Sequence, residues 1–284
     1  DDDWLTTNLN VNYTEPLSTR LSLILNYTLN NESSHDDKRS FNLAAASPNT
    51  IDSAFSTRMN SSVLRNQAGA SLNYTAKKLI VKVGNNVKLV DMDLESIYNN
   101  VNVNKQFTNL NPNANFNYKF SNYKAINISY NGTANNPERT QLLPFSYNNT
   151  QVTTFLPNLD LRNSFTNNIN AYFYESKILT SVYYGGNAGY TRTSDPIVQS
   201  ILVSPAGTYT YQFVNMNGYA NSNYYFNTYY SKKIKGIDLQ TGASVNLNGG
   251  TSYSPINSEV NKLDYHTYSL AVETFKSKMK KYSI

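Results

Sequence analysis

The 284-residue sequence predicts an all-β fold, an antiparallel transmembrane β-barrel that forms one domain over residues 1–284. Apolar and polar residues alternate in segments of about ten residues, the length with which a tilted strand crosses a bilayer. The polar positions of these segments are mostly uncharged amides and hydroxyls, as in the wet interior of a membrane barrel. Short and long connections also alternate between the segments. A soluble sheet would instead carry more charge on its polar face.

The clearest alternation lies in residues 109–131. Leu110, Phe116 and Tyr118 share one parity there, and asparagines occupy the other. Successive side chains of a strand point to opposite faces, so this segment has one apolar face and one amide face. A short turn at 121–123 makes it a hairpin.

The same alternation predicts strands along the rest of the chain, and we count about eleven complete strands and the start of a twelfth. The predicted strands cover residues 5–13, 21–29, 68–74, 79–89, 109–120, 126–131, 165–173, 178–190, 214–226, 239–247 and 268–272. Short turns are predicted near residues 15–18, 76–78, 121–123, 175–177, 231–236 and 276–281. Long loops are predicted at 30–61, 91–106, 132–161, 191–208 and 249–264.

The composition agrees with this fold class. Hydrophobic residues make up 39% of the chain and the mean hydropathy is −0.52, and no apolar run approaches the roughly 18 residues of a spanning helix. The 24 tyrosines suit the two lipid–water interfaces of a barrel. The chain has no cysteine, which fits an exported protein that does without disulfides.

Nine asparagines are predicted to face the lumen of the barrel. They are Asn109, Asn111, Asn113, Asn115, Asn117, Asn215, Asn217, Asn221 and Asn223. A neutral amide surface of this kind suits contact with a plug domain or the lining of a water-filled pore. The absence of a charged constriction favours the plug.

No enzyme is predicted, because the sequence has no Gly-x-Ser-x-Gly elbow, no glycine-rich phosphate loop and no His-Glu-x-x-His motif. We therefore expect no catalytic residue and no cofactor. His35 and His266 fall in or near predicted loops. Asp91, Asp93 and Glu95 share one parity at the end of a strand and are weak candidates for a calcium site or a lipopolysaccharide bridge. The alternative is a solvated loop entry, which we favour.

The net charge of +5 does not predict nucleic-acid binding, because the lysines concentrate at the predicted short turns instead of forming a basic stripe. They are Lys77, Lys78, Lys177, Lys232, Lys233, Lys235, Lys276, Lys278, Lys280 and Lys281. At one end of a barrel, such residues either contact phospholipid head groups or serve as polar turn residues.

Two segments carry a family resemblance. Residues 136–144 read Asn-Pro-Glu-Arg-Thr-Gln-Leu-Leu-Pro, and residues 156–164 read Leu-Pro-Asn-Leu-Asp-Leu-Arg-Asn-Ser. With the barrel pattern of the whole chain, they resemble TonB-dependent outer-membrane transporters, especially the Asn- and Tyr-rich outer-membrane β-barrel family of Bacteroidetes. Leu156 stands where that family has Gly-Asn, and Leu161-Arg162 stand where it has Pro-Glu.

The resemblance implies a bacterial outer-membrane location, a barrel of about 22 strands of which this chain covers about half, and a plug domain that contacts TonB. It implies uptake of a scarce ligand through long extracellular loops. Expected partners are outer-membrane lipid, lipopolysaccharide, the plug and TonB. A structural or assembly subunit, associated for example with a surface lipoprotein, and a small self-contained channel are the alternatives. The identity of the ligand is not readable from the sequence.

Overall fold

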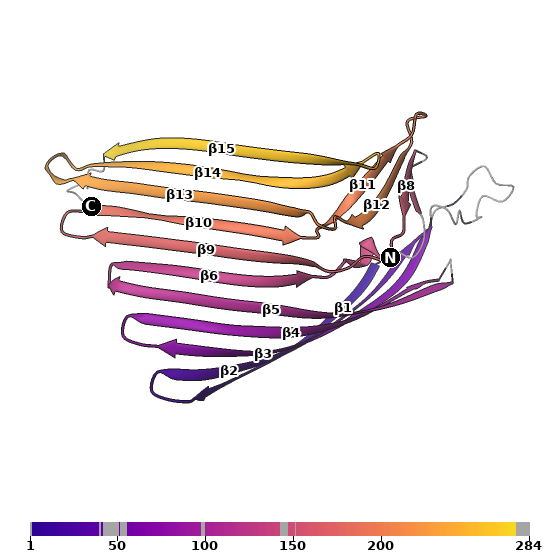
Figure 1. Ribbon diagram of the computed structural model, residues 1–284, viewed down its shortest axis with the longest axis horizontal. Helices are drawn as coiled ribbons and strands as arrows, with labels where there is room; N and C mark the ends of the chain where they lie inside the picture. Colours follow the sequence, from indigo (N-terminus) through magenta and orange to yellow (C-terminus); the bar gives the residue numbers. More distant parts are fainter. Residues whose placement is uncertain are drawn as a thin grey trace, which may run out of the picture.

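A computed structural model describes residues 2–39, 41, 51, 56–97, 100–142, 147–150 and 152–276. Within these residues, fifteen strands join in one sheet. Eleven long strands form a curved wall, each paired antiparallel with the next wall strand along the chain (Figure 1). They are β1 (Asp2–Pro16), β2 (Leu21–Lys38), β3 (Thr57–Thr75), β4 (Leu79–Ser96), β5 (Val101–Ser121), β6 (Lys124–Asn135), β9 (Ser164–Lys177), β10 (Val182–Ser194), β13 (Ala220–Ile234), β14 (Leu239–Ile256) and β15 (Glu259–Lys276).

The predicted count of eleven complete strands is therefore confirmed for the wall. The expected start of a twelfth strand, near Ile284, lies outside the described residues. Among the described strands, β1 pairs only with β2 and β15 only with β14, so the sheet is open between them.

Four short strands and two 3-10 helices complete the structure. The strands are β7 (Tyr147–Thr150), β8 (Thr153–Leu156), β11 (Ile197–Val203) and β12 (Tyr209–Asn215), and the helices are η1 (Arg139–Gln141) and η2 (Lys235–Ile237). β11 and β12 form a hairpin, and β12 pairs in parallel with β8. A parallel pair between Ile201 and Ile256 connects the hairpin to β14.

The two ends of the wall differ in their connections. One end, here called the turn end, carries the short links at 17–20, 76–78, 122–123, 178–181 and 235–238. Figure 1 shows these links on the left, and the short strands and η1 at the opposite end, here called the loop end. The predicted alternation of short and long connections holds for most of the wall, but fails at two places at the loop end. Only residues 97–100 separate β4 from β5, and β14 and β15 meet in a two-residue turn at 257–258.

The strands run further toward the loop end than predicted. The predicted loops at 30–61 and 91–106 shorten because β2 extends to Lys38, β3 begins at Thr57, β4 extends to Ser96 and β5 begins at Val101. The predicted loop at 249–264 is the extended β14–β15 hairpin. These predictions were wrong because the pattern of polarity inverts along the strands.

The inversion is clearest in β3 and β4. On the outer face at the loop end stand Asn60, Asp93 and Glu95, whereas Val63 and Leu94 on the opposite face are completely buried. Nearer the turn end the same outer face is apolar, with Val83 and Leu72 exposed. An outer face that turns polar beyond the apolar band has the sequence pattern of a loop, although the backbone stays extended.

The predicted strand 214–226 is also divided. β12 ends at Asn215, a turn follows at 217–218, and β13 begins at Ala220. Gly218 has a φ of 79°, in the left-handed region that favours glycine. The backbone therefore reverses at a residue suited to a turn.

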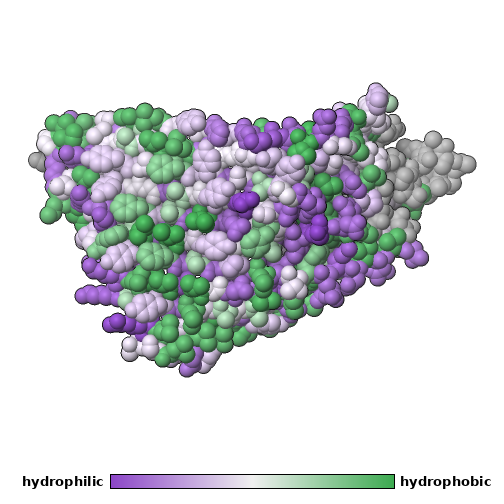
Figure 2. All heavy atoms as spheres, in the orientation of Figure 1, coloured by the Kyte–Doolittle hydropathy of each residue, from purple (hydrophilic) through white to green (hydrophobic). Residues whose placement is uncertain are grey.

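The outer face carries the apolar surface. Figure 2 shows hydrophobic residues gathered toward the turn end, with hydrophilic residues more frequent toward the loop end. Among the described residues, no helix combines the length and apolar character required to cross a membrane.

Candidate functional site: the inner wall and its docked segment

The inner face of the wall is lined with amides and hydroxyls. Asn109, Asn111, Asn113, Asn115 and Asn117 share one face of β5, in register with Asn131, Ser129 and Asn127 of β6. Asn221 and Asn223 of β13 lie on the same face of the sheet, which the register connects through β9 and β10. If the wall closes into a barrel, these seven asparagines line its lumen.

A hollow of about 580 Å³ lies on this face over β1–β6. Its lining includes Asn26, Gln67, Asn86, Lys82 and Lys88. Gly69 lies between Asn26 and Asn86 in the register, and the missing side chain lets the two amides hydrogen bond at 3.3 Å. The surface offers both donors and acceptors to a polar occupant.

At the loop end, a segment of residues 136–142 and 157–163, here called the docked segment, folds onto the inner face. Its Leu142 is completely buried and its Leu161 is 3% exposed. They join an apolar cluster that otherwise belongs to the wall, made by Val63, Val90, Met92, Leu94 and Val103. Burial of these side chains is the main force that holds the segment on the wall.

Three asparagines close a ring between the docked segment and β5. The amide of Asn109 donates to Asn136 Oδ1 at 2.7 Å, and that of Asn136 donates to Asn163 Oδ1 at 3.0 Å. Asn163 completes the ring by donating to Asn109 Oδ1 at 2.6 Å. Asn109 is 1% exposed, so this ring satisfies a buried amide that would otherwise carry a desolvation penalty.

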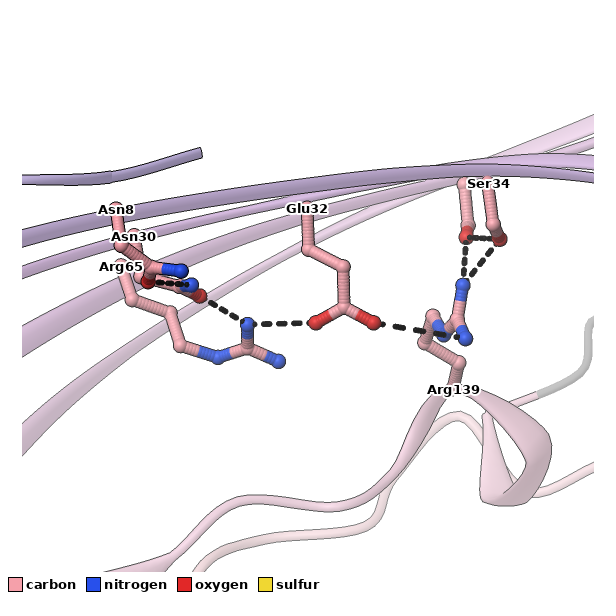
Figure 3. Close-up of polar contacts among 7 residues, drawn as sticks. Asn8, Asn30, Glu32, Ser34, Arg65 and Arg139 are labelled. Atoms are coloured by element: carbon pink, nitrogen blue, oxygen red, sulfur yellow. Dashed lines mark hydrogen bonds and ion pairs between the residues drawn. The ribbon is translucent and has the colours of Figure 1, made fainter. Parts of the chain in front are cut away.

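Arg139 provides the charged anchor of the docked segment. Figure 3 shows its guanidinium beside Ser34 and Glu32, with Arg65 on the other side of the Glu32 carboxylate. Arg139 Nη1 donates to the hydroxyls of Ser34 and of Ser61, the latter at 2.7 Å, and its Nη2 lies 3.7 Å from Glu32 Oε1.

Arg65 extends this network along the wall. Its Nη1 lies 2.9 Å from Glu32 Oε2 and donates to Asn30 Oδ1 at 2.6 Å. Asn30 in turn donates to Asn8 on β1 at 2.6 Å (Figure 3). One carboxylate is thus shared by two guanidinium groups, one from the wall and one from the docked segment.

Asn215 and Asn217 do not lie on a wall strand, contrary to the prediction. The Asn215 side chain accepts from the backbone N–H of Arg162 at 2.8 Å and donates to the carbonyl of the same residue at 2.9 Å. Asn217 accepts from the Arg162 guanidinium at 3.1 Å. Both residues lie outside β13, since Asn215 ends β12 and Asn217 is in the turn at 217–218. Their contacts tie the docked segment to the β11–β12 hairpin.

Arg139, Glu32 and Ser61 were not predicted as site residues. Glu32 and Ser61 fell in the predicted loop at 30–61, and Arg139 fell in the loop at 132–161. The arginine's place in the segment 136–144, which carries the family resemblance, was the available signal.

Asp91, Asp93 and Glu95 share the outer face of β4, as their parity predicted. Asn104 donates to Asp93 Oδ1 at 2.7 Å, and Asn60 donates to Glu95 Oε2 at 2.9 Å. In the part of the chain that the structure describes, no group of three or more His, Cys, Asp or Glu residues is placed to share a metal ion. The geometry therefore adds no support for a cation site.

The two histidines lie on strands and not in loops. His35 Nδ1 is 2.6 Å from Asn60 Oδ1, and His266 Nδ1 is 2.7 Å from the hydroxyl of Tyr224. Each imidazole is thus part of a cross-strand polar pair.

Comparison with protein families decides the identity of the wall. The model of the outer membrane protein beta-barrel family matches residues 4–283. The chain belongs to this family. It is an outer-membrane protein, and its short turns therefore mark the periplasmic end and its loop end the extracellular one.

Solved structures share the fold at low sequence identity. The copper transporter OprC is similar with a TM-score of 0.63 and 10% identity, over 88% of this chain and 38% of that one. The FrpB iron transporter from Neisseria meningitidis is similar with a TM-score of 0.57 and 12% identity, over 88% of this chain and 36% of that one. The hemophore receptor HasR from Serratia marcescens is similar with a TM-score of 0.54 and 11% identity, over 95% of this chain and 53% of that one. No curated protein sequence matches the chain.

These structures confirm the predicted fold, and the family match confirms the predicted outer-membrane location. The chain spans about a third to a half of the length of these structures. The docked segment lies entirely within the two segments that carry the family resemblance.

Proposed function

We propose that the chain forms part of the wall of a TonB-dependent uptake barrel, in which the lumen holds a plug domain and the extracellular loops capture a scarce ligand. The docked segment is the observation that carries this proposal. It covers the inner face of the wall at the extracellular end, by contacts that an unobstructed pore does not need. The proposed role is that of a receptor and not of an enzyme.

The amide lining supports the same proposal. A plug must be held against the wall by many hydrogen bonds and must still be able to move. Neutral amides meet both needs, because each hydrogen bond contributes a net stabilisation of only about 1 kcal/mol. Asn113, Asn115 and Asn117 each offer both hydrogen-bond donors and acceptors. Such a lining suits contact with the surface of a polypeptide better than it suits the selection of ions.

The chain contains no cysteine, so single-cysteine variants give a clean test. Asn113→Cys places a thiol on the inner face, and Asn102→Cys places one on the outer face at the extracellular end. The full-length protein would be labelled with a membrane-impermeant maleimide in cells with and without TonB. We expect labelling at position 113 to be slow, and to become faster only when TonB and the proton gradient are present.

Equal, fast labelling of position 113 in both strains would overturn the proposal and favour a small channel. Slow labelling that does not respond to TonB would favour a structural or assembly subunit, for example one bound to a surface lipoprotein. Position 102 controls for thiol reactivity and surface exposure in all strains.

A further inference from the structure

The outer face of the wall, near the periplasmic end, carries an apolar groove of about 260 Å³ over β6, β9, β10 and β13. Gly186 and Ala188 of β10 and Ala171 of β9 form its floor. The larger side chains around them form its walls, and they are Ile126, Phe173, Tyr184 and Phe226. The groove exists because small residues lie beside aromatic ones on neighbouring strands.

The register shows how the groove is built. Gly186 pairs with Phe173 on one side and with Thr228 on the other, and Ala188 pairs with Ala171 and Phe226. A side chain could not be added at Gly186 without a shift, because its Cβ would lie 2.6 Å from the carbonyl oxygen of Asn227. The hollow at Gly186 is therefore fixed by the backbone.

Basic side chains gather at the periplasmic end of the groove. Lys124 Nζ lies 2.8 Å from Glu175 Oε2 and 5.7 Å from the centre of the Phe173 ring. Lys177 Nζ lies 5.6 Å from the centre of the Tyr184 ring, which is a wall of the groove. Its distance of 3.7 Å from Glu175 Oε1 makes a looser ion pair than that of Lys124.

Lys232 joins them from β13. Val182 pairs with Lys177 on one side and with Lys232 on the other, so the two lysines flank it, about 10 Å apart between Cα atoms. Lys124 and Lys177 pair with one carboxylate, that of Glu175, and with Lys232 the cluster has a net charge of +2. Since Glu175 engages Lys124 most closely, Lys177 and Lys232 remain to receive an anion.

We propose that this groove is a binding site for an anionic phospholipid of the inner leaflet, with its phosphate between Lys177 and Lys232 and one acyl chain along Gly186 and Ala188. From Tyr184 to Ala188 the strand rises about 13 Å, and with a strand tilt of about 40° this carries the groove about 10 Å into the roughly 15 Å of hydrocarbon in one leaflet. The site faces lipid in an outer-membrane barrel, its head group end is cationic and its tail end is apolar. This arrangement fits a lipid better than a neighbouring protein, for which the cationic rim would need an acidic partner.

The first test uses native mass spectrometry of the full-length protein in detergent, titrated with phosphatidylglycerol. Lys177→Gln/Lys232→Gln removes the proposed phosphate contacts, and Ala188→Leu fills the groove. Matched controls are Lys77→Gln/Lys78→Gln at another short turn and Ala68→Leu at an outward position of β3. We expect the lysine pair to weaken retention of one lipid about thirtyfold, near fivefold per lysine, and Ala188→Leu to abolish it.

The second test needs no variant and guards against misfolding. Wild-type protein in membranes would be photolabelled with phosphatidylglycerol that carries a diazirine on its acyl chain. We expect labels concentrated on peptides containing Phe173, Ala188 and Phe226. Labels spread evenly around the wall, or equal lipid retention by test and control variants, would overturn the site. Crosslinks to a second polypeptide at this groove would also overturn it, in favour of a protein interface.

Discussion

The side-chain amide of Asn163 donates to that of Asn109 across 54 positions of sequence, and Asn136 completes the ring. Each of the three residues donates to one of the other two and accepts from the remaining one. The ring is therefore satisfied as a whole, and loss of any one member leaves two groups without their partner. It joins β5 to both ends of the docked segment.

Asn109→Ala should release the docked segment from β5. The expected cost is about 1–3 kcal/mol, because the partly buried side chains of Asn136 and Asn163 each lose a hydrogen-bond partner. Hydrogen exchange of residues 136–142 and 157–163 would measure it. The Asn109→Ala/Asn163→Ala variant should cost little more than either single change. Asn113→Ala, on the same face of β5 but outside the ring, should leave exchange unchanged. Additive effects of the two ring substitutions would contradict the cooperative ring.

Leu142→Ala should loosen the same segment through its apolar contacts. Leu142 is completely buried against the wall cluster, and such a truncation costs about 2–5 kcal/mol. Limited proteolysis of the folded protein would detect faster cleavage near η1. Leu202→Ala, at a position 43% exposed, is the control and should leave the cleavage rate unchanged. Equal rates for both variants would show that the cluster does not hold the segment.

Arg139→Gln should weaken the anchor at Glu32 by about 1 kcal/mol, because both side chains are partly exposed and water screens the pair. Arg139→Lys should restore little, since an ammonium lacks the guanidinium fork that reaches two hydroxyls. A double-mutant cycle with Glu32→Gln, again read by hydrogen exchange, isolates the pairwise energy. A coupling indistinguishable from zero would assign the anchor to Ser34 and Ser61 alone.

Gly69→Ala should disturb the middle of the inner wall. An added Cβ would lie 1.8 Å from Asn86 Oδ1 and 2.4 Å from Asn26 Oδ1, so the two amides must move apart and lose their hydrogen bond. We expect a loss of stability of about 1 kcal/mol in urea unfolding. Gly236→Ala, where no atom lies within 4 Å of the added Cβ, is the control. A Gly69→Ala variant as stable as the wild type would mean that the amide pair does not contribute to stability.

Acid should loosen the extracellular part of the β14–β15 hairpin. The Lys262 ammonium at 2.8 Å, together with the Thr251 hydroxyl, lowers the pKa of Asp264. A carboxyl whose pKa is lowered by folding stabilises the fold at any pH above its pKa in the unfolded chain, near 3.9. This contribution to stability is lost as the pH falls through its pKa in the folded protein. The protection factors of the amides near residue 264, which correct for the intrinsic change of the exchange rate with pH, should therefore decrease below about pH 4. Asp264→Asn should remove that step, and an unchanged step would assign it to another group.

The sequence predicts the wall well because lipid and water impose a period of two on every spanning strand. Leu110, Phe116 and Tyr118 against their asparagine neighbours show it directly. The pattern stops predicting strands at the loop end, where the outer face no longer contacts lipid and the inner face no longer contacts water. Above the apolar band Glu95 faces outward and Leu94 inward, because a folded segment covers the inner face there. Nothing local to β4 reports that cover, since Leu142 and Leu161 come from distant parts of the chain. For the same reason Glu32 and Arg139 could not be paired from sequence, and Asn215 kept strand parity although a turn separates it from β13.

The contacts of Arg139 also bear on the order of assembly. Wall strands pair mostly with their neighbours along the chain, so hairpins can form early with little loss of loop entropy. The bond from Arg139 to Ser34 spans 105 positions and needs β2 and β3 already paired, since Ser61 completes it. The docked segment can therefore close only on a finished stretch of wall. An undocked segment therefore marks a chain in which this stretch of wall has not yet paired.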